Sequence, residues 1–200
     1  MRKKLIIGNW KMNLNTSQSS LLLHRLHERI KIHRDIELVL APSMLVLQPL
    51  SMQIDRRKFR LAAQNAYHKD SGAYTGEVSF TMLQDLVHYV IIGHSERRLY
   101  FEESLDSVRE KVTAAVRNGI TPVLCVGETQ HERHNGETKQ VLHDQLTTGL
   151  SDLTATEVRE AVIAYEPRWA IGTGVTAKPG QIDEAIAYIR HQIRELYGPK

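Results

Sequence analysis

The stretch AYEPRWAIGTG, residues 164–174, ends an apolar run with a carboxylate, Glu166, and continues directly into a glycine-containing segment. Pro167 fixes one backbone angle at the start of that segment, whereas Gly172 and Gly174 supply conformational freedom and unhindered amide groups near its end. A general base needs a dry position within reach of a substrate proton. A carboxylate at the end of a buried strand, beneath a loop that is able to close, meets that need. In another context Glu166 would be tied to a neighbouring cation.

Five further apolar runs precede this one along the chain. Their apolar residues are adjacent and do not alternate with polar ones, which is typical of parallel strands covered on both faces. The sequence predicts six strands, at residues 4–10, 36–42, 59–65, 89–94, 121–127 and 161–167.

Helical patterns fill the intervals between the predicted strands. The first begins at Thr16 or Ser17 as a candidate N-cap, and two others cover residues 103–119 and 180–198, with apolar residues three or four positions apart. The region 131–147 also reads as helical, and residues 43–54 and 79–87 as shorter helical stretches.

Strand and helix alternate six times without a break in composition, which predicts one domain over residues 1–200 and a parallel sheet with right-handed crossovers. Both a doubly wound open sheet and a (β/α)₈ barrel fit this alternation. The first strand runs into GNWKMN, residues 8–13, which is no dinucleotide-binding fingerprint. In a barrel, the ends of many strands converge on one face that holds the site. Polar side chains follow most of the strands, namely Asn9, Lys11, Asn65, His94, Glu128 and Glu166.

The composition of the chain argues against several classes of function and location. Of the 200 residues, 42% are apolar and 24% charged, and the net charge is only +3 with no basic block, which argues against nucleic-acid binding. Cys125 is the single cysteine, so no intrachain disulfide forms and a reducing compartment is the simpler interpretation. The apolar run after the basic N-terminus, residues 5–7, is too short for a signal peptide, and no segment reaches the ~20 apolar residues of a membrane span. We expect a cytoplasmic protein without membrane contact.

Metal-ligand patterns are weak. His24 with His27, and His131 with His134, have a spacing that could face one ligand, but they lie on polar helical stretches without further ligands nearby. We expect all four histidines to be solvated, and Cys125 to be a buried apolar residue.

Six motifs together resemble the triosephosphate isomerase family, in its order and spacing across almost the whole chain. They are GNWKMN (8–13), AAQN (62–65), GAYTGEVS (72–79), IIGHSERR (91–98), LCVGE (124–128) and AYEPRWAIGTG (164–174). The resemblance implies an α/β fold, the (β/α)₈ or TIM barrel. It also implies that the protein interconverts dihydroxyacetone phosphate and glyceraldehyde 3-phosphate, a reaction of glycolysis and gluconeogenesis. It implies neither cofactor nor metal.

By this resemblance, Glu166 is the catalytic base and His94 the electrophile that donates to the enediolate oxygen. The stretch after His94 reads as a helix start with Ser95 near its cap, and the partial positive charge there disfavours an imidazolium ion. The role of a neutral imidazole is carried over from the family. Glu128 and Trp169 match supporting positions of the same site.

Further positions match substrate-binding and assembly residues of the family. Lys11 and Asn9 correspond to the lysine and asparagine that contact the substrate, and Glu96 to the acidic partner of that lysine. Gly172 corresponds to the lid glycine that binds the phosphate. Thr75 corresponds to a residue that inserts into a second subunit, so the resemblance implies a homodimer.

The chain departs from the family in three places. It has six predicted strands where the barrel has eight, so the last two units and their glycine-rich phosphate-binding segments are absent from these residues. We expect a chain of these 200 residues to be poorly active by itself. Arg168 stands where the family usually has an aliphatic residue, and GEVSF (76–80) lacks the proline common after this serine.

Two alternatives to the isomerase interpretation stay open. The chain could be a catalytically impaired fragment that binds a sugar phosphate or serves as an assembly piece. It could also be a paralogous isomerase of another short sugar phosphate, for which Arg168 is the only hint.

Overall fold

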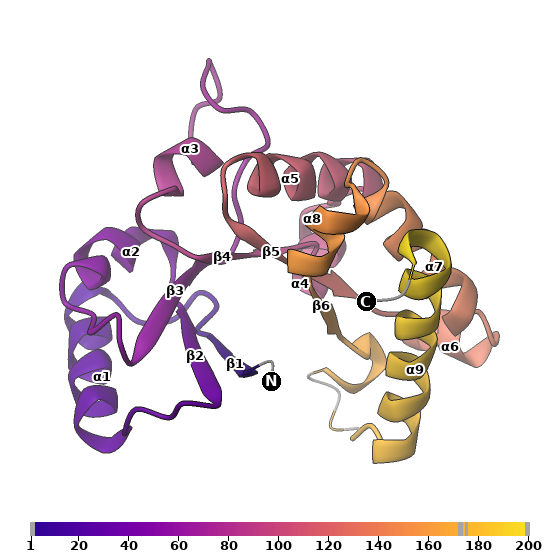
Figure 1. Ribbon diagram of the computed structural model, residues 1–200, viewed down its shortest axis with the longest axis horizontal. Helices are drawn as coiled ribbons and strands as arrows, with labels where there is room; N and C mark the ends of the chain where they lie inside the picture. Colours follow the sequence, from indigo (N-terminus) through magenta and orange to yellow (C-terminus); the bar gives the residue numbers. More distant parts are fainter. Residues whose placement is uncertain (1–2, 172–173, 175, 199–200) are drawn as a thin grey trace. The chain divides into compact units, whose positions relative to one another are not determined.

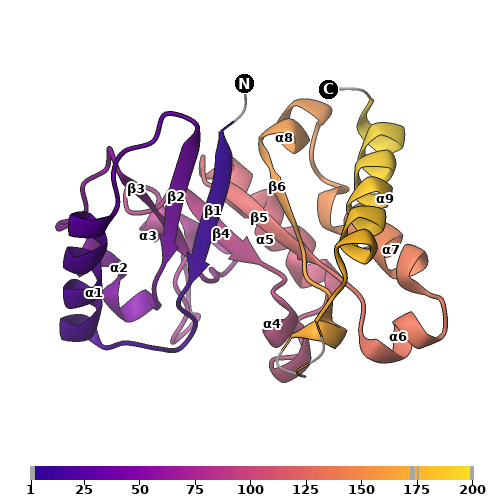
Figure 2. The same ribbon diagram turned by 90° about the horizontal axis from the view of Figure 1, so that it is seen from below.

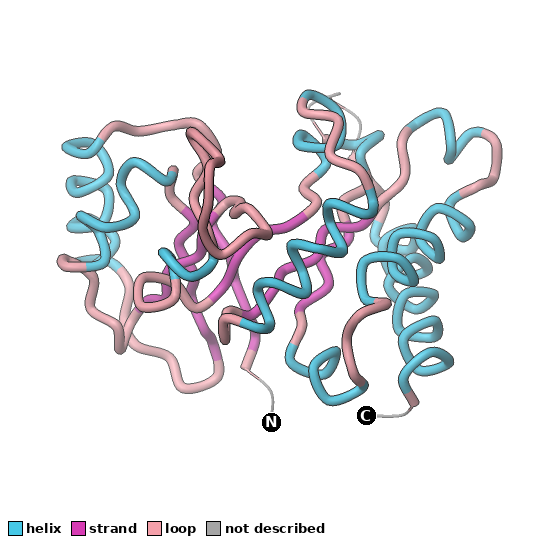
Figure 3. The backbone as a smooth tube through the Cα atoms, turned by 90° about the horizontal axis from the view of Figure 1, so that it is seen from above, coloured by secondary structure: helices cyan, strands magenta, loops and turns pink. Residues whose placement is uncertain are grey.

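The computed structural model describes residues 3–171, 174 and 176–198. Two compact units are distinguished by their internal contacts: Met1–Ile91 with Arg117–Ile120, and Ile92–Val116 with Thr121–Lys200. Each unit is described by itself below. Figure 3 shows that strand and helix alternate along the chain in both.

The first unit is built on parallel strands that pair in chain order. Its strands are β1 (Lys4–Asn9), β2 (Ile36–Ala41), β3 (Phe59–Ala63) and β4 (Tyr89–Ile92), whose last residue is counted with the second unit. In register, Lys4 lies opposite Ile36, Leu38 opposite Phe59, and Ala62 opposite Tyr89. Helices α1 (Thr16–Arg29) and α2 (Met44–Ser51) lie on one side of β1–β3 (Figure 1), and the short α3 (Phe80–Leu83) precedes β4.

The second unit contains the parallel pair β5 (Thr121–Val126) and β6 (Val162–Tyr165), with Val123 opposite Val162. Helices α7 and α9 pack side by side in this unit (Figure 2). Its helical segments are α4 (Ser95–Tyr100), α5 (Leu105–Arg117), α6 (Gln130–His134), α7 (Thr138–Leu150), α8 (Ala155–Glu160), the 3₁₀ turn η1 (Arg168–Ala170) and α9 (Pro179–Tyr197).

The six predicted strands are confirmed, each within a few residues at its end. The predicted helical region 131–147 consists of two helices, α6 and α7, with a short break between them. Gly136 adopts a φ of 75°, a left-handed conformation that ends α6 and allows α7 to start in a new direction. The predicted N-cap of the first helix is wrong by one residue. Asn15 caps α1, and a reciprocal hydrogen bond with Gln18 completes a capping box.

Apolar side chains of the strands and of the inner helix faces form the core of each unit. Cys125 is buried, as expected from its apolar strand. A few charged groups are buried with it, among them Glu103, Lys111 and Glu128. None of the helices that the structure describes combines the length and the apolar character needed to cross a bilayer.

Candidate active site

His94 and Glu166 lie in contact in the second unit. The imidazole Nε2 of His94 is 3.1 Å from Oε1 of Glu166, and the Ser95 backbone N–H donates to Oε2 at 2.9 Å. The two side chains are only 12% and 16% exposed. A carboxylate and an imidazole that lie 72 residues apart in the sequence and follow different strands are thus brought together in a largely buried place.

The start of α4 fixes the tautomer of His94. His94 is itself the N-cap residue, and its Nδ1 accepts the Glu96 backbone N–H at 3.2 Å. Ser95 occupies the first helical position, next to the cap, as expected from the sequence. Because Nδ1 must keep a lone pair to accept this bond, the ring proton is on Nε2, and Nε2 donates to Glu166. The imidazole in this arrangement is neutral.

Glu96 lies beside the same ring. Its Oε2 is 3.5 Å from Nδ1, which is too long for a good hydrogen bond, so we regard the shorter backbone contact as the one that defines the ring. The predicted pairing of Glu96 with Lys11 joins residues of the two different units and stays a prediction.

The backbone of Glu166 is held closely against the end of β5. Its N–H donates to the Val126 carbonyl at 2.7 Å. A Cβ atom added to Gly127 would lie 1.8 Å from the Glu166 carbonyl oxygen, so only glycine fits there. Burial, and then the charge of Glu166, raise the pKa of the Cys125 thiol well above its usual value. The thiol beneath the carboxylate is therefore neutral.

Asn9 and Lys11 form a strained turn at the end of β1 in the first unit. Lys11 has a φ of 54°, which is uncommon for a side chain of this kind, and its N–H donates to Oδ1 of Asn9 at 2.9 Å. The side-chain amide of Gln64 donates to the carbonyls of Lys11 and Ala41, at 2.9 Å each. These bonds hold Lys11 in a conformation that is seen most often at functional sites.

Glu128 joins several elements of the second unit. Its side chain is fully buried and accepts hydrogen bonds from Arg133 at 2.9 Å, from the indole N–H of Trp169 at 3.0 Å, and from the hydroxyl of Tyr165 at 3.0 and 3.1 Å. Arg133 also stacks over the Trp169 ring, 4.3 Å from its centroid. Burial, followed by the charge of Glu128, raises the pKa of Tyr165. This cluster anchors the chain on both sides of Glu166.

The structure gives less information about three other residues predicted from the sequence. Gly172 lies outside the described residues. Thr75 is exposed in the loop that follows β3. Arg168 begins η1, and its backbone N–H donates to the Glu128 carbonyl at 3.2 Å, a contact that does not depend on its side chain.

No group of three or more metal-ligating side chains gathers in the part of the chain that the structure describes. The expectation of four solvated histidines is wrong for His27. Its ring stacks on Phe59, with centroids 5.2 Å apart, and its Nε2 accepts the Asp55 backbone N–H.

Sequence reasoning missed Tyr165, Arg133 and Gln64 as parts of the site. Tyr165 could have been found, since it is the last residue of β6, directly before Glu166, and a buried phenol needs a partner. Arg133 and Gln64 carry no local signal, because their roles depend on carbonyl or carboxylate groups that the fold brings to them from distant segments.

This arrangement supports proton transfer. A carboxylate accepts a proton from carbon, and a neutral imidazole N–H donates to an oxygen that becomes negative as the proton leaves. Both groups lie in one dry place, on rigid strand and helix ends.

Comparisons with known proteins agree with this chemistry. Residues 4–200 match the family described as Triosephosphate isomerase. A curated triosephosphate isomerase of Clostridium tetani is 43% identical over 100% of this chain and 78% of its own length. Those of Chloroherpeton thalassium and Geotalea uraniireducens are each 44% identical, over 99% and 98% of this chain and 79% and 78% of their own lengths. The six parallel strands with their helices agree with six of the eight units of a TIM barrel. The chain belongs to the triosephosphate isomerase family.

Proposed function

We propose that the chain interconverts dihydroxyacetone phosphate and glyceraldehyde 3-phosphate through an enediolate. The observation that carries this proposal is the contact between Glu166 and the Nε2–H of His94, in a chain of this family. The substrate is a small phosphorylated molecule, and the proton transfers are the work of side chains.

The reaction begins when Glu166 removes a proton from the carbon beside the substrate carbonyl. The electron pair of the C–H bond forms the carbon–carbon double bond of the enediolate, and the carbonyl oxygen becomes negative. His94 donates its Nε2–H to that oxygen. Glu166 then delivers its proton to the former carbonyl carbon, while Nε2 of His94 regains a proton from the hydroxyl on the other carbon, where the new carbonyl forms. Both side chains return to their starting state, so atoms and electrons balance without an external oxidant.

The substrate has to replace the hydrogen bond between His94 and Glu166. Both oxygens of Glu166 already accept hydrogen bonds, one from His94 and one from Ser95. A substrate between the two side chains takes over the His94 donor, and one oxygen of Glu166 is released to act as base. The Ser95 N–H keeps the carboxylate near its position during this exchange.

Lys11 and Asn9 supply the electrostatic part of the proposal. A lysine ammonium near the substrate stabilises the negative charge of the enediolate and phosphate, and an asparagine amide donates to a substrate oxygen. The strained Lys11 backbone supports this role because strain of this kind persists where surrounding bonds impose it.

The direct test of the base is Glu166→Asp. The shorter side chain moves the carboxylate away from the substrate carbon, so we expect kcat to fall by about 10²–10⁴-fold. Glu160→Asp is the matched control, since Glu160 is exposed at the end of α8. Both are measured in the chain and in a version that also carries the seventh and eighth units of the family. Unchanged turnover of Glu166→Asp would refute the assignment.

Calorimetric titration with phosphoglycolate, beside a turnover assay, separates the isomerase from a chain that only binds. Binding with turnover supports the proposal. Binding without turnover in either version of the chain would instead favour the sugar-phosphate binder.

We also propose a homodimer. Several apolar side chains of the first unit are exposed, namely Met12 (95%), Leu45 (74%) and Met82 (65%). Thr75 is also exposed, in the polar loop that follows β3. A second copy is a suitable cover for apolar groups of this kind. We expect Thr75→Arg to shift the mass measured by light scattering from dimer to monomer, and Thr156→Arg, at an exposed threonine of the second unit, to leave it unchanged. A monomeric unmodified chain would contradict the proposal.

The reaction belongs to glycolysis and gluconeogenesis, and we propose the cytoplasm as its location. A lone, buried, reduced cysteine suits a reducing compartment. Cell fractionation tests this location, and recovery of the protein in an oxidising compartment would overturn it.

A further inference from the structure

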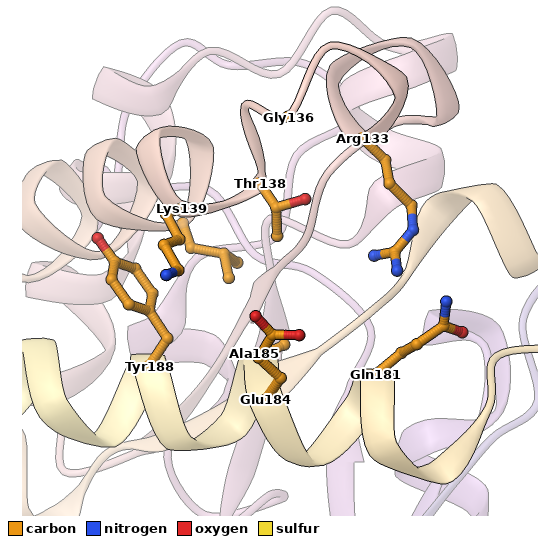
Figure 4. Close-up of a pocket in the computed structure, with 9 residues that line it drawn as sticks. Arg133, Gly136, Thr138, Lys139, Gln181, Glu184, Ala185 and Tyr188 are labelled. Atoms are coloured by element: carbon orange, nitrogen blue, oxygen red, sulfur yellow. The ribbon is translucent and has the colours of Figure 1, made fainter.

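A cavity of about 380 Å³ lies in the second unit between α6–α7 and α9, apart from His94 and Glu166. Figure 4 shows Arg133 facing Gln181 at one end, Lys139 and Tyr188 at the other, and Thr138 between them. The volume is within the range of pockets that hold small molecules. Neither the proposed reaction nor the dimer uses this cavity.

The polar lining of the cavity favours an anion. Arg133 and Lys139 contribute charged N–H donors; the charge of Arg133 is balanced by the buried Glu128, and Glu184 adds one negative charge. Gln181 uses its Oε1 to accept the Lys178 N–H at 2.9 Å, so its NH₂ group is directed to other acceptors. These donors match a carboxylate or a phosphate group.

The start of α7 adds to the positive potential. Thr138, the first residue of α7, lines the cavity, and the preceding N-cap residue, Glu137, makes no capping hydrogen bond through its side chain. Such a helix start carries partial positive charge and N–H groups that seek acceptors. It reinforces the charges of Arg133 and Lys139.

The rest of the lining suits a short carbon skeleton. Leu142 and Ala185 form a buried apolar floor, and the ring of Tyr188 lies 5.9 Å from the Nζ of Lys139. A hydroxyl or ammonium group on the ligand would find an acceptor in the exposed carboxylate of Glu184. The ligand class is therefore a small organic anion, either a phosphate monoester or a carboxylate.

Arg133 connects the cavity with the residues that follow Glu166. The same guanidinium that lines the cavity donates to Glu128 at 2.9 Å and stacks over Trp169 at 4.3 Å. An anion on the other N–H donors of Arg133 shares the guanidinium with Glu128 and Trp169, and a ligand shifts a protein between arrangements when its contacts with them differ.

We propose that this cavity binds a small organic anion and that its occupancy is transmitted through Arg133 to Trp169. The site is distinct from the proposed isomerase site, and its binding does not depend on turnover.

The test is a titration of the ¹⁵N-labelled full chain, followed by the amide signals of Gly136, Thr138 and Ala185 and by the indole N–H signal of Trp169. The probes are glycerol 2-phosphate, citrate and, as the uncharged control, glycerol. We expect saturable shifts with the phosphate ester, with citrate or with both, at a dissociation constant near or below ~1 mM, and none with glycerol. The two anions distinguish a phosphate site from a carboxylate site. Absence of saturable shifts with both would overturn the proposal.

Variants locate the binding and the coupling. Lys139→Gln should weaken binding roughly tenfold, because a charge-assisted hydrogen bond is lost. Arg190→Gln, which removes the same charge from an exposed position of α9 outside the lining, should leave binding unchanged. Equal binding by wild type and Lys139→Gln would overturn the assignment of the site.

Arg133→Lys tests the coupling, because it keeps the charge but loses the planar group that stacks on Trp169. We expect the cavity amides still to shift and the Trp169 indole signal to stop responding. An indole signal that stays still in the wild-type chain while the cavity saturates would refute the coupling. Turnover measured on the same samples separates the two proposals, since a chain that binds these probes but does not isomerise contradicts only the proposed function.

Discussion

At the residue scale, the protonation state of His94 is set by one backbone hydrogen bond. The Glu96 N–H occupies Nδ1, which leaves Nε2 as the donor toward Glu166. The positions of both side chains at strand ends could be predicted from the sequence, and their roles from the family resemblance. The capping role of the ring could not, because sequence signatures of N-caps rest on Ser, Thr, Asp and Asn.

His94→Asn separates capping from catalysis. Asparagine is among the best N-cap residues, so α4 should keep its start and the melting temperature should stay close to that of the wild type. The Nε2 donor is lost, and we expect kcat to fall by about 10²–10⁴-fold. Enzyme kinetics and thermal melts measure the two effects. Full activity of a well-folded His94→Asn chain would exclude the imidazole from the chemistry.

At the element scale, most boundaries follow from local signals. The strands were predictable because their apolar runs, of four to six residues in the structure, are shorter than a typical helix and alternate with longer helical patterns. The region 131–147 reads as helical, and the break between α6 and α7 has a local signal, because Asn135-Gly136 is a common helix-ending pair. The contacts between elements were harder to predict from the sequence, since those around Glu128 involve four separate segments.

Glu128→Gln tests that junction. The amide has nearly the shape of the carboxylate but carries no charge and leaves at least one of the donors from Arg133, Tyr165 and Trp169 poorly paired in a buried place. We expect a loss of about 1.5–3 kcal/mol in the free energy of unfolding, together with a changed Trp169 fluorescence. Chemical denaturation and emission spectra measure both. Glu137→Gln, at an exposed position nearby in the chain, should change neither, and equal effects of the two substitutions would contradict the role given to Glu128.

At the scale of the whole molecule, the sequence predicts one domain, and the structure resolves two compact units along the chain. Because strands and helices alternate without interruption, the sequence contains no linker or change of composition that would indicate the boundary between the two units. We propose that the 200 residues unfold as one domain. Scanning calorimetry should then show a single transition whose calorimetric and van't Hoff enthalpies agree. Two resolved transitions would mean that the units fold separately.

The acid stability of the molecule depends on a buried charged group in the second unit. Burial by itself would raise the pKa of Glu103, but hydrogen bonds and charges from Lys111 and Arg97 outweigh it and lower the pKa below its ordinary value of 4.5. A group whose pKa is lowered by folding stabilises the protein above its unfolded pKa, and this contribution is lost as the pH falls through the folded value.

Glu103→Gln removes this contribution. We expect a loss of about 3–5 kcal/mol at neutral pH, because Lys111 is left buried without its ionised partner. The difference between variant and wild type should shrink as the pH falls below about 4.5. Urea denaturation at a series of pH values measures it, with Glu160→Gln as the exposed control. A pH-independent difference would show that ionisation of Glu103 is not its source.

In the proposed reaction, Glu166 moves a proton between substrate carbons while His94 donates to the oxygen. Turnover of dihydroxyacetone phosphate in deuterium oxide, followed by proton NMR of the product, tests it most directly, because a proton held on a carboxylate exchanges with solvent. We expect turnover, and any deuterium on the product carbon that receives the proton, to be lost together in Glu166→Gln. Turnover or labelling that persists in Glu166→Gln would show that another group moves the proton.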